Sequence, residues 1–597
     1  MSFNADLADR FNTMATLLEL TGANPFRVNA YARAARAVEN NSQELNKLST
    51  SELVEIEGIG KGIAAHIREV AETGELEELT ELQRTVPPGL AEVLDIQGLG
   101  PKTVRLLWKE LGITDRASLS QAIESGEILK LPRMGKKTVE NIERALSFAS
   151  KSKDRLPLGV AAPIADRLVE RMRQVKGVTR AEVAGSIRRG RDTIGDIDIL
   201  VVANDPAKAE AAFCEHDDVL EIVARGKTKC SVRLAVDIDT GRWTSDGDQR
   251  HSIGVDLRII ESSSFGSAWL YFTGSKAHNV RLREIAQKKN LTLNEYGLFP
   301  DDPKAKGSPQ SRGVKPVASR TEKQIYTKLG LVMPPPEIRE DAGELDLKNE
   351  PRLIEISDIK SELHAHTTAS DGVMSLDELV GCAIDRGFHT IAVTDHSRSS
   401  AQANGLSVER LRAQRGEIEQ AKERFSDRIQ ILAGSEVDIL ADGSLDYDDE
   451  VLAELDIVVA SPHIALSQDT ATATKRLIRA IEHPMVHIIG HPTGRLIGRR
   501  PGLSPAMDEV IAAAVEHNTA LEINSHWMRL DLRDVHVRAA VEAGCLIAID
   551  CDDHAPGDFD NLRYGIQTGR RGWLTRDLCI NTWSKTKLTK WLRSKRS

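Results

Sequence analysis

Three aspartates in the middle of the chain have the types and spacing needed to bind divalent cations. Asp196 and Asp198 lie in the alternating stretch Asp-Ile-Asp-Ile-Leu-Val-Val, which is typical of a strand. Because side chains alternate along a strand, both carboxylates share one face while the isoleucines point into a core. Asp256 lies in a second alternating stretch, 255–260, and could join them from a neighbouring strand. Carboxylates this close repel one another unless a cation lies between them. Mg²⁺ takes such oxygen ligands and shares its remaining positions with phosphates.

A turn of small residues precedes these aspartates. Gly185 and Ser186 can offer backbone N–H groups and a hydroxyl to a phosphate, and Arg188, Arg189 and Arg191 add positive charge. An Asp-x-Asp pair alone is a weak signal, since many strand edges carry one. A phosphate-binding turn upstream of it and a third carboxylate downstream together predict a nucleotidyl-transfer site.

The order of these motifs resembles the X family of DNA polymerases, in which a Gly-Ser motif precedes an Asp-x-Asp pair and a later strand supplies a third aspartate. The resemblance continues through Leu-Tyr-Phe-Thr-Gly-Ser at 270–275 and Asn-Glu-Tyr-Gly at 294–297. It implies that Asp196, Asp198 and Asp256 are catalytic and hold Mg²⁺. The nucleotide-binding residues that it implies are Gly185, Ser186, Arg189, Gly195, Tyr271, Phe272, Gly274, Asn279 and Arg283.

A second group of chemically competent residues follows residue 351. Apolar, strand-like segments there end repeatedly in histidine or carboxylate side chains, with helical segments such as 376–386 and 408–425 between them. This layout is typical of a barrel whose site lies at the carboxyl ends of its strands. The candidate metal ligands are His364, His366, Asp371, His396, Glu436, His463, His491, Asp552 and His554.

Nine ligands are too many for one ion, and histidines with a carboxylate suit Zn²⁺, Mn²⁺ or Fe²⁺. The pattern resembles the PHP (polymerase and histidinol phosphatase) family. That resemblance implies a distorted (β/α)7 barrel that holds up to three ions, Mn²⁺ or Zn²⁺, for phosphoester hydrolysis. A single such histidine is more often a core or surface residue, so the prediction depends on the series of strand ends.

The glycine pattern of the N-terminal region indicates DNA binding. Gly58 and Gly60 form a Gly-Ile-Gly turn before an apolar-patterned helix, and Gly98 and Gly100 repeat it. Backbone N–H groups at such a helix start can bind phosphate. The repeats resemble helix-hairpin-helix units, which hold the DNA backbone without reading sequence. Some X-family members carry a Schiff-base lysine in this region, where this chain has His66. An imidazole cannot form an imine, so we predict no 5′-deoxyribose-phosphate lyase activity by that route.

Composition describes an ordinary multidomain protein. The chain has 597 residues, a net charge of −10 and six cysteines with no Cys-x-x-Cys motif, which favours reduced thiols and a cytoplasmic location. We expect neither a membrane span nor a signal peptide. The predicted divisions are 1–83 and 84–150 (helix-hairpin-helix), 151–262 (α/β nucleotidyltransferase palm), 263–340 (thumb-like lobe), 341–352 (linker) and 353–597 (PHP barrel).

The succession of an X-family polymerase and a PHP barrel is similar to bacterial and archaeal family X polymerases. It implies a monomeric DNA-directed DNA polymerase that uses dNTPs to fill short gaps on gapped or primer–template DNA during base excision repair. It also implies a 3′–5′ exonuclease or other 3′-end processing activity, or an AP endonuclease activity, in the barrel. Two alternatives stay open: a polymerase fused to a small-molecule phosphatase, and a non-catalytic DNA-binding scaffold.

Overall fold

A computed structural model describes residues 3–39, 41, 43–56, 58–94, 99–132, 134–135, 139, 142, 155–236, 251–302 and 307–595. The chain divides into two compact units, one dominated by the first 154 residues and one that contains 155–236 and 252–597. No helix in the described part of the chain is both long enough and apolar enough to cross a membrane. The six cysteines are all free thiols.

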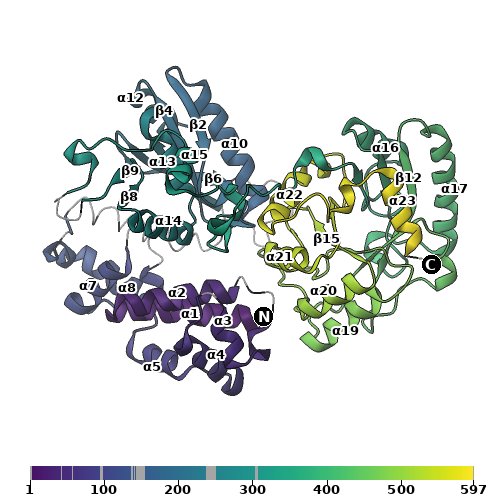
Figure 1. Cartoon of the computed structure of the whole chain (residues 1–597), viewed down its shortest axis with the longest axis horizontal. Helices are drawn as coiled ribbons and strands as arrows, with labels where there is room; N and C mark the ends of the chain where they lie inside the picture. Colours follow the sequence, from purple (N-terminus) through teal and green to yellow (C-terminus); the bar gives the residue numbers. More distant parts are fainter. Residues whose placement is uncertain are drawn as a thin grey trace. The chain divides into compact units, whose positions relative to one another are not determined.

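The first unit is helical (Figure 1). Leu7, Phe11, Met14 and Leu18, at spacings of three and four, bury one face of its first helix against the second helix and the helices that follow. Its described α-helices are α1 (Phe3–Thr21), α2 (Pro25–Glu39), α3 (Thr50–Glu55), α4 (Lys61–Thr73), α5 (Glu77–Thr85), α6 (Leu90–Leu94), α7 (Pro101–Leu111) and α8 (Arg116–Glu124).

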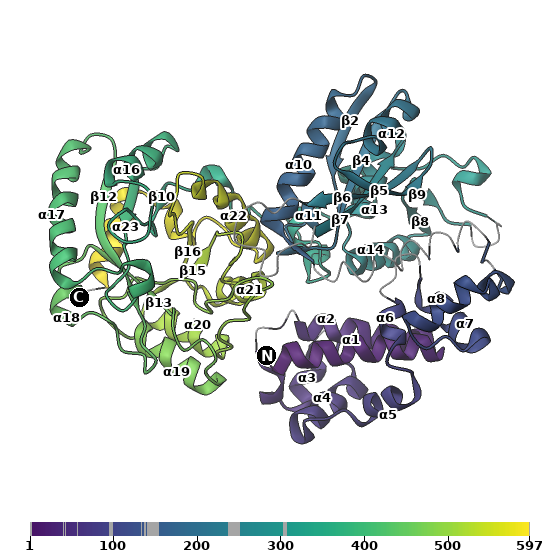
Figure 2. The same ribbon diagram turned by 180° about the vertical axis from the view of Figure 1, so that it is seen from behind.

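The second unit begins with a five-stranded sheet in the order β2-β4-β7-β6-β5, flanked by α10 and α12 (Figure 2). Its strands are β2 (Val178–Val183), β4 (Asp196–Ala203), β5 (Val219–Arg225), β6 (Lys229–Val236) and β7 (His251–Ile259). The strands β1 (Leu156–Pro157) and β3 (Thr193–Ile194) pair separately. The helices are α10 (Leu158–Gln174), α11 (Gly185–Arg188) and α12 (Pro206–Cys214). Along β4 the isoleucines are buried while Asp196 is exposed and Asp198 half-buried, as the alternation predicts.

A smaller lobe follows the sheet. It consists of α13 (Phe265–Thr273), α14 (Lys276–Lys288), the hairpin β8 (Leu291–Asn294) and β9 (Gly297–Pro300), and α15 (Glu322–Leu329). His278 and Tyr326 are buried at its centre, where the His278 ring bonds both the Tyr326 hydroxyl and the Glu344 carboxylate at 2.6 Å. Glu344 lies in the stretch predicted as a linker, so this part of the linker packs into the lobe.

The remainder of the second unit is a nearly closed barrel of seven parallel strands in sequential order. An isolated parallel bridge between Ala365 and Asp553 joins the segments that directly follow the first and last strands. The strands are buried on both sides, which fits the nearly continuous apolar runs of parallel strands covered by helices. They are β10 (Ser361–Glu362), β11 (Thr390–Val393), β12 (Gln430–Asp438), β13 (Ile457–Ser461), β14 (Ile488–Ile489), β15 (Ala520–Asn524) and β16 (Ile547–Asp550).

Helices surround the barrel (Figure 1). Ser375 begins the first of them with a capping box, in which its hydroxyl and the Glu378 carboxylate satisfy each other's backbone N–H groups. The described α-helices are α16 (Leu376–Asp385), α17 (Val408–Arg424), α18 (Asp449–Leu452), α19 (Thr470–Ile481), α20 (Met507–Glu516), α21 (Asp534–Ala543), α22 (Leu562–Arg571) and α23 (Lys585–Ser594). Polar side chains of the barrel gather instead in the loops at the carboxyl ends of the strands.

Candidate functional sites

The three aspartates predicted as a cation site meet on two adjacent strands. Strand β4 pairs in parallel with β7, and in that register Asp198 is the partner of Asp256. Burial raises the pKa of Asp198 to about 7, and the neighbouring charges of Asp196 and Asp256 add to the shift. Burial and Asp256 also raise the pKa of Asp196. Carboxylates that resist ionisation in each other's presence form a site that a divalent cation would stabilise.

The third carboxylate is held by its own strand neighbours. The Ser231 hydroxyl donates to Asp256 Oδ1 at 2.6 Å, and Lys229 Nζ lies 2.8 Å from Asp256 Oδ2. Both partners come from β6, the strand on the other side of β7. The sequence analysis did not single out Lys229 or Ser231, although the alternation of polar and apolar residues along 229–234 is typical of a strand.

The Gly-Ser turn lies directly against this carboxylate face. Gly185 has a φ of +62°, and a Cβ on it would lie 2.3 Å from Asp198 Oδ2, so a side chain is excluded on both counts. The backbone N–H of Ala184 donates to the Asp198 carbonyl at 2.9 Å. Ser186 is half-buried one residue further on. The structure therefore brings the predicted phosphate turn and the predicted cation site together.

The neighbouring arginines differ in what they contact. Arg188 binds the Glu322 carboxylate through two nitrogens, at 2.8 and 2.7 Å, and stacks 3.4 Å over the Trp269 ring. Arg189 donates through Nε to Glu340 at 3.0 Å and through Nη1 to the Thr273 carbonyl. The positive charge of Arg188 is therefore neutralised by the Glu322 carboxylate within the protein, which the sequence did not indicate.

The remaining predicted nucleotide residues lie on the two helices of the small lobe. Tyr271 and Phe272 end α13 with their rings edge to face, 5.1 Å apart. Asn279 on α14 donates to the Tyr271 carbonyl at 2.7 Å, and Arg283 one turn later donates to the Asn279 carbonyl at 3.2 Å. Gly274 separates the helices at a φ of +70°. Gly195 directly precedes β4.

The nine predicted ligands of the second centre converge at the carboxyl ends of the barrel strands. Eight of them form three overlapping groups whose ligand atoms lie within 4.8 Å of one another. The ninth, His491, places Nε2 2.9 Å from Glu436 Oε1. The groups are His366, Asp371, His396 and His554; His364, His366, Glu436 and Asp552; and His396, Glu436 and His463.

The donor atoms of this cluster fit divalent cations. Buried polar atoms rarely lack a hydrogen-bond partner, yet six of the predicted ligands have at least one such unpartnered atom, and all six residues are 7% exposed or less. These atoms are His364 Nε2, His366 Nδ1 and Nε2, His396 Nδ1, Glu436 Oε2, His491 Nδ1 and Asp552 Oδ1. Burial, with the neighbouring imidazoles, lowers the pKa of His366 to about 4, so this ring is neutral near pH 7 and able to coordinate.

Two carboxylates that sequence reasoning missed orient the histidines. Glu522 accepts from His364 Nδ1 at 2.7 Å, and Asp438 contacts His463 Nδ1 at 2.5 Å. Such partners fix the tautomer and direct the other nitrogen into the site. Burial opposes protonation of His463, but Glu436 and Asp438 outweigh it and raise its pKa to about 10. The sequence does contain a signal for Glu522, because a carboxylate within the otherwise apolar strand segment 520–523 is unusual.

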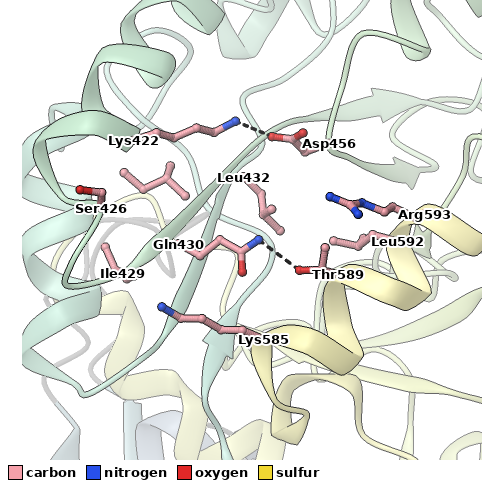
Figure 3. A pocket seen from close by; sticks show the side chains of 11 residues that line it. Lys422, Ser426, Ile429, Gln430, Leu432, Asp456, Lys585, Thr589, Leu592 and Arg593 are labelled. Carbon is pink, nitrogen blue, oxygen red and sulfur yellow. Dashed lines mark hydrogen bonds and ion pairs between the residues drawn. The ribbon is translucent and has the colours of Figure 1, made fainter.

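A cavity of about 500 Å³ lies elsewhere on the barrel, beside the first residues of β12 (Figure 3). Lys422 reaches Asp456 across it at 2.7 Å, and Gln430 reaches Thr589 of α23 at 3.3 Å. None of the nine predicted ligands lines it. It lies by the starts of strands, whereas the ligand cluster lies by their ends, so it is not part of the metal centre.

The glycine turns of the N-terminal unit begin helices as predicted. Gly60 is the residue before α4, and Gly100 is the residue before α7. Gly58 has a φ of +96°, which an L-residue adopts only with strain. Gly98 lies outside the described residues.

His66 lines a cavity beside the first of these turns, together with Tyr31 and Arg27. The Tyr31 hydroxyl lies 2.8 Å from His66 Nδ1 and donates to Glu78 at 3.2 Å, and Arg27 pairs with the same carboxylate. Burial, then Glu78, raises the pKa of Tyr31 to about 12. Among the described residues that line this pocket, His66 supplies an imidazole and none is a lysine.

The fold and the two sites together define a class: a nucleotidyltransferase with helix-hairpin-helix DNA-binding elements, joined to a metal-dependent phosphoesterase barrel. Family models match along the chain. They are a helix-hairpin-helix domain at 2–76, a SAM-like helix-hairpin-helix tandem at 90–147, the DNA polymerase beta palm at 155–244, the DNA polymerase beta thumb at 268–340 and the PHP domain at 362–526. The last match ends before Asp552 and His554, which the structure adds to the site.

Curated proteins give the same result. The chain is 38% identical to the DNA polymerase/3′-5′ exonuclease PolX of Bacillus subtilis over 95% of both chains. It is 26% identical to DNA polymerase lambda of Rattus norvegicus over 55% of each, and 29% identical to a probable phosphatase of Thermoanaerobacter over 39% of this chain and 95% of the relative. The chain belongs to the family X DNA polymerases that carry a PHP domain, and it uses divalent metal ions.

Proposed function

We propose that this polymerase fills short gaps in DNA repair and that its barrel shortens or cleans DNA 3′ ends. The observation that carries the proposal is the presence of two complete and separate ligand sets, the register-paired aspartates of β4 and β7 and the histidine cluster of the barrel. The Bacillus subtilis relative bears both a polymerase and a 3′–5′ exonuclease in its name. We further propose that the enzyme acts on gapped or primer–template DNA as a monomer in the cytoplasm.

In the polymerase site, Asp196, Asp198 and Asp256 would hold two Mg²⁺ ions. Bound there, the ions would lower the pKa of the primer 3′-hydroxyl and neutralise the leaving pyrophosphate. The role we assign to Lys229 is to compensate Asp256 until the site is loaded, since its ammonium lies 2.8 Å from that carboxylate. Ser186 and Arg189 would bind the triphosphate oxygens.

The small lobe would position the incoming nucleotide and the primer terminus. We assign Tyr271 and Phe272 to the sugar, with Gly274 bending the chain between the two helices. Asn279 and Arg283, four residues apart on one helix, would reach the minor-groove side of the new base pair. Gly58, Gly60, Gly98 and Gly100 would hold the DNA backbone through N–H groups at helix starts.

In the barrel, the nine ligands would hold up to three Mn²⁺ or Zn²⁺ ions. Such ions generate a nucleophile from water near neutral pH and polarise a phosphoryl oxygen. The protein's part is orientation: Glu522 and Asp438 fix the His364 and His463 rings. AP endonuclease activity would use the same residues.

The test is one primer–template incubation with Mg²⁺ or Mn²⁺, with and without dNTPs, in which extension and 3′ shortening are followed together. Asp256→Ala should abolish extension and leave shortening, and His364→Ala with His366→Ala should do the reverse. Glu261→Gln, at an exposed carboxylate just past β7, and His389→Ala, at a barrel histidine outside the cluster, are the matched controls. Loss of both activities in folded Asp256→Ala protein would refute two independent sites.

A second function for the barrel is favoured by one observation: the probable phosphatase matches over 95% of its own length. The barrel would then hydrolyse small phosphomonoesters. Turnover of p-nitrophenyl phosphate, abolished by the paired histidine substitutions, with no shortening of DNA 3′ ends would establish this alternative over the exonuclease.

A further inference from the structure

Arg189 is fixed in the structure through part of its guanidinium only. Its Nε donates to Glu340 Oε1 at 3.0 Å and its Nη1 donates to the Thr273 carbonyl. Gly274 has a φ of +70°, and a Cβ on it would lie 3.1 Å from Nη1, so both the backbone conformation and the close approach favour a glycine. Within the described residues, Nη2 makes no hydrogen bond. One nitrogen thus remains for a phosphate oxygen.

The barrel supplies a second guanidinium at the same carboxylate. Arg571, the last residue of α22, has a side chain only 5% exposed. Its Nη1 donates to Glu340 Oε1 at 3.0 Å, the oxygen that Arg189 also binds, and to the Arg189 carbonyl at 2.9 Å. Its other nitrogens are held by Asp534 at 2.7 Å. Arg571 therefore contacts both the backbone and the counterion of Arg189.

The rest of the loop after the Gly-Ser turn also lies on the barrel. Gly190 has a φ of +64°, and a Cβ there would lie 3.0 Å from the Gln567 Cβ, which is on α22. Further along, Asp192 Oδ2 pairs with Arg495 Nη1 at 3.1 Å. The loop that follows the Gly-Ser turn is thus packed against α22, the helix that carries Arg571.

We propose that Arg571 of the PHP barrel is a positioning residue for nucleotide binding in the polymerase site. While Arg571 shares the Glu340 carboxylate, Arg189 keeps positive charge for a triphosphate. Without Arg571, Arg189 would be the sole counterion of a buried carboxylate, which competes with phosphate, and its carbonyl would lose its donor. This inference rests on the proposed role of Arg189.

Two substitutions at Arg571 test it, with the adjacent arginine as the control. Arg571→Lys keeps a positive charge beside Asp534 but cannot reach all the acceptors, and Arg571→Gln removes the charge. Arg570 lies on the same helix and pairs with Glu337 at 2.8 Å without touching Arg189. Arg570→Lys and Arg570→Gln therefore disturb the same contact region but not the nucleotide arginine.

We expect both Arg571 variants to raise the KM for dNTP by about 5- to 10-fold, the order of the net contribution of one ordinary hydrogen bond, with kcat nearly unchanged. The Arg570 variants should keep the KM of the parent enzyme, and 3′ shortening should be the same in all five proteins. If Arg571→Gln fails to fold, Arg571→Lys alone decides, because it leaves no buried carboxylate uncompensated.

Three results would overturn the proposal: an unchanged dNTP KM in the Arg571 variants, an equal rise in the Arg570 variants, or a fall in kcat with no change in KM. Arg189→Gln separates this failure from failure of the underlying assignment. If Arg189→Gln raises the dNTP KM while the Arg571 variants do not, only the positioning role is wrong. If Arg189→Gln also leaves KM unchanged, the nucleotide-binding role of Arg189 is wrong.

Discussion

Glu322 is the residue whose loss we expect to loosen the small lobe most. It is 5% exposed and its two oxygens bind two arginines, Arg188 of α11 and Arg339, which is fully buried. The nearest of these contacts are 2.7 and 2.6 Å long. Glu322→Gln keeps the shape of the side chain and removes the charge, which leaves two arginines without their counterion.

The size of the effect follows from the pKa of this carboxyl group. Burial raises it, but Arg339 and Arg188 outweigh burial and lower the pKa from 4.5 to about 2. At about 1.4 kcal/mol per pKa unit, this corresponds to roughly 3 kcal/mol in favour of the folded lobe. Removal of one partner from a buried ion pair typically costs about 3 to 5 kcal/mol, which is consistent.

The sign of the pH dependence is set by the direction of this shift. A carboxyl group whose pKa is depressed on folding stabilises the folded state above its unfolded pKa of about 4.5, and that stabilisation disappears as the pH falls toward 2. The difference between the parent protein and Glu322→Gln should therefore be full at pH 7 and should shrink below pH 4.5.

Hydrogen exchange of the α15 amides measures this locally, which suits a chain of several domains better than one melting temperature. We expect exchange in Glu322→Gln at pH 7 to be faster by about 100-fold, the ratio that 3 kcal/mol implies. Lys323→Gln, at an exposed neighbour on the same helix, is the control. Exchange within about threefold of the parent rate would refute the assigned energy.

Three further outcomes are expected. Protein purified without chelator should carry more than one transition-metal ion per chain. Asp438→Asn should weaken metal binding by the barrel by about 10- to 100-fold, because His463 loses the carboxylate that orients its ring. The surface variant Asp442→Asn is the control, and a metal content in Asp438→Asn equal to that of this control would contradict the prediction. No borohydride-trapped adduct should form between residues 1–83 and 5′-deoxyribose phosphate, and abasic-site cleavage should disappear with EDTA. An EDTA-resistant adduct would disprove the prediction, and trapping gained in His66→Lys would support it.

Much of the fold could be predicted because its signals are local. Alternation along 196–202 depends only on strand geometry, and β4 buries its isoleucines accordingly. The repeated apolar segments of the barrel, most of which end in predicted metal ligands, likewise indicated a parallel barrel with its site at the strand ends. Boundaries were less accessible: Glu344, expected in a linker, is buried against His278, because nothing local marks a contact 66 residues away.

The sequence by itself determined which residues are chemically competent, since residue type and spacing are properties of the chain. It could not determine how charges are shared, because the partner of a charged group is chosen by packing between distant segments. In the sequence, positive charge is all that can be assigned to Arg188, Arg189 and Arg191, yet in the structure Arg188 is paired with Glu322. Glu340 holds the second in common with Arg571, which lies 382 residues further along the chain than Arg189. Only the tertiary structure, by burying these arginines beside particular carboxylates, decided which of them keeps a nitrogen for a phosphate.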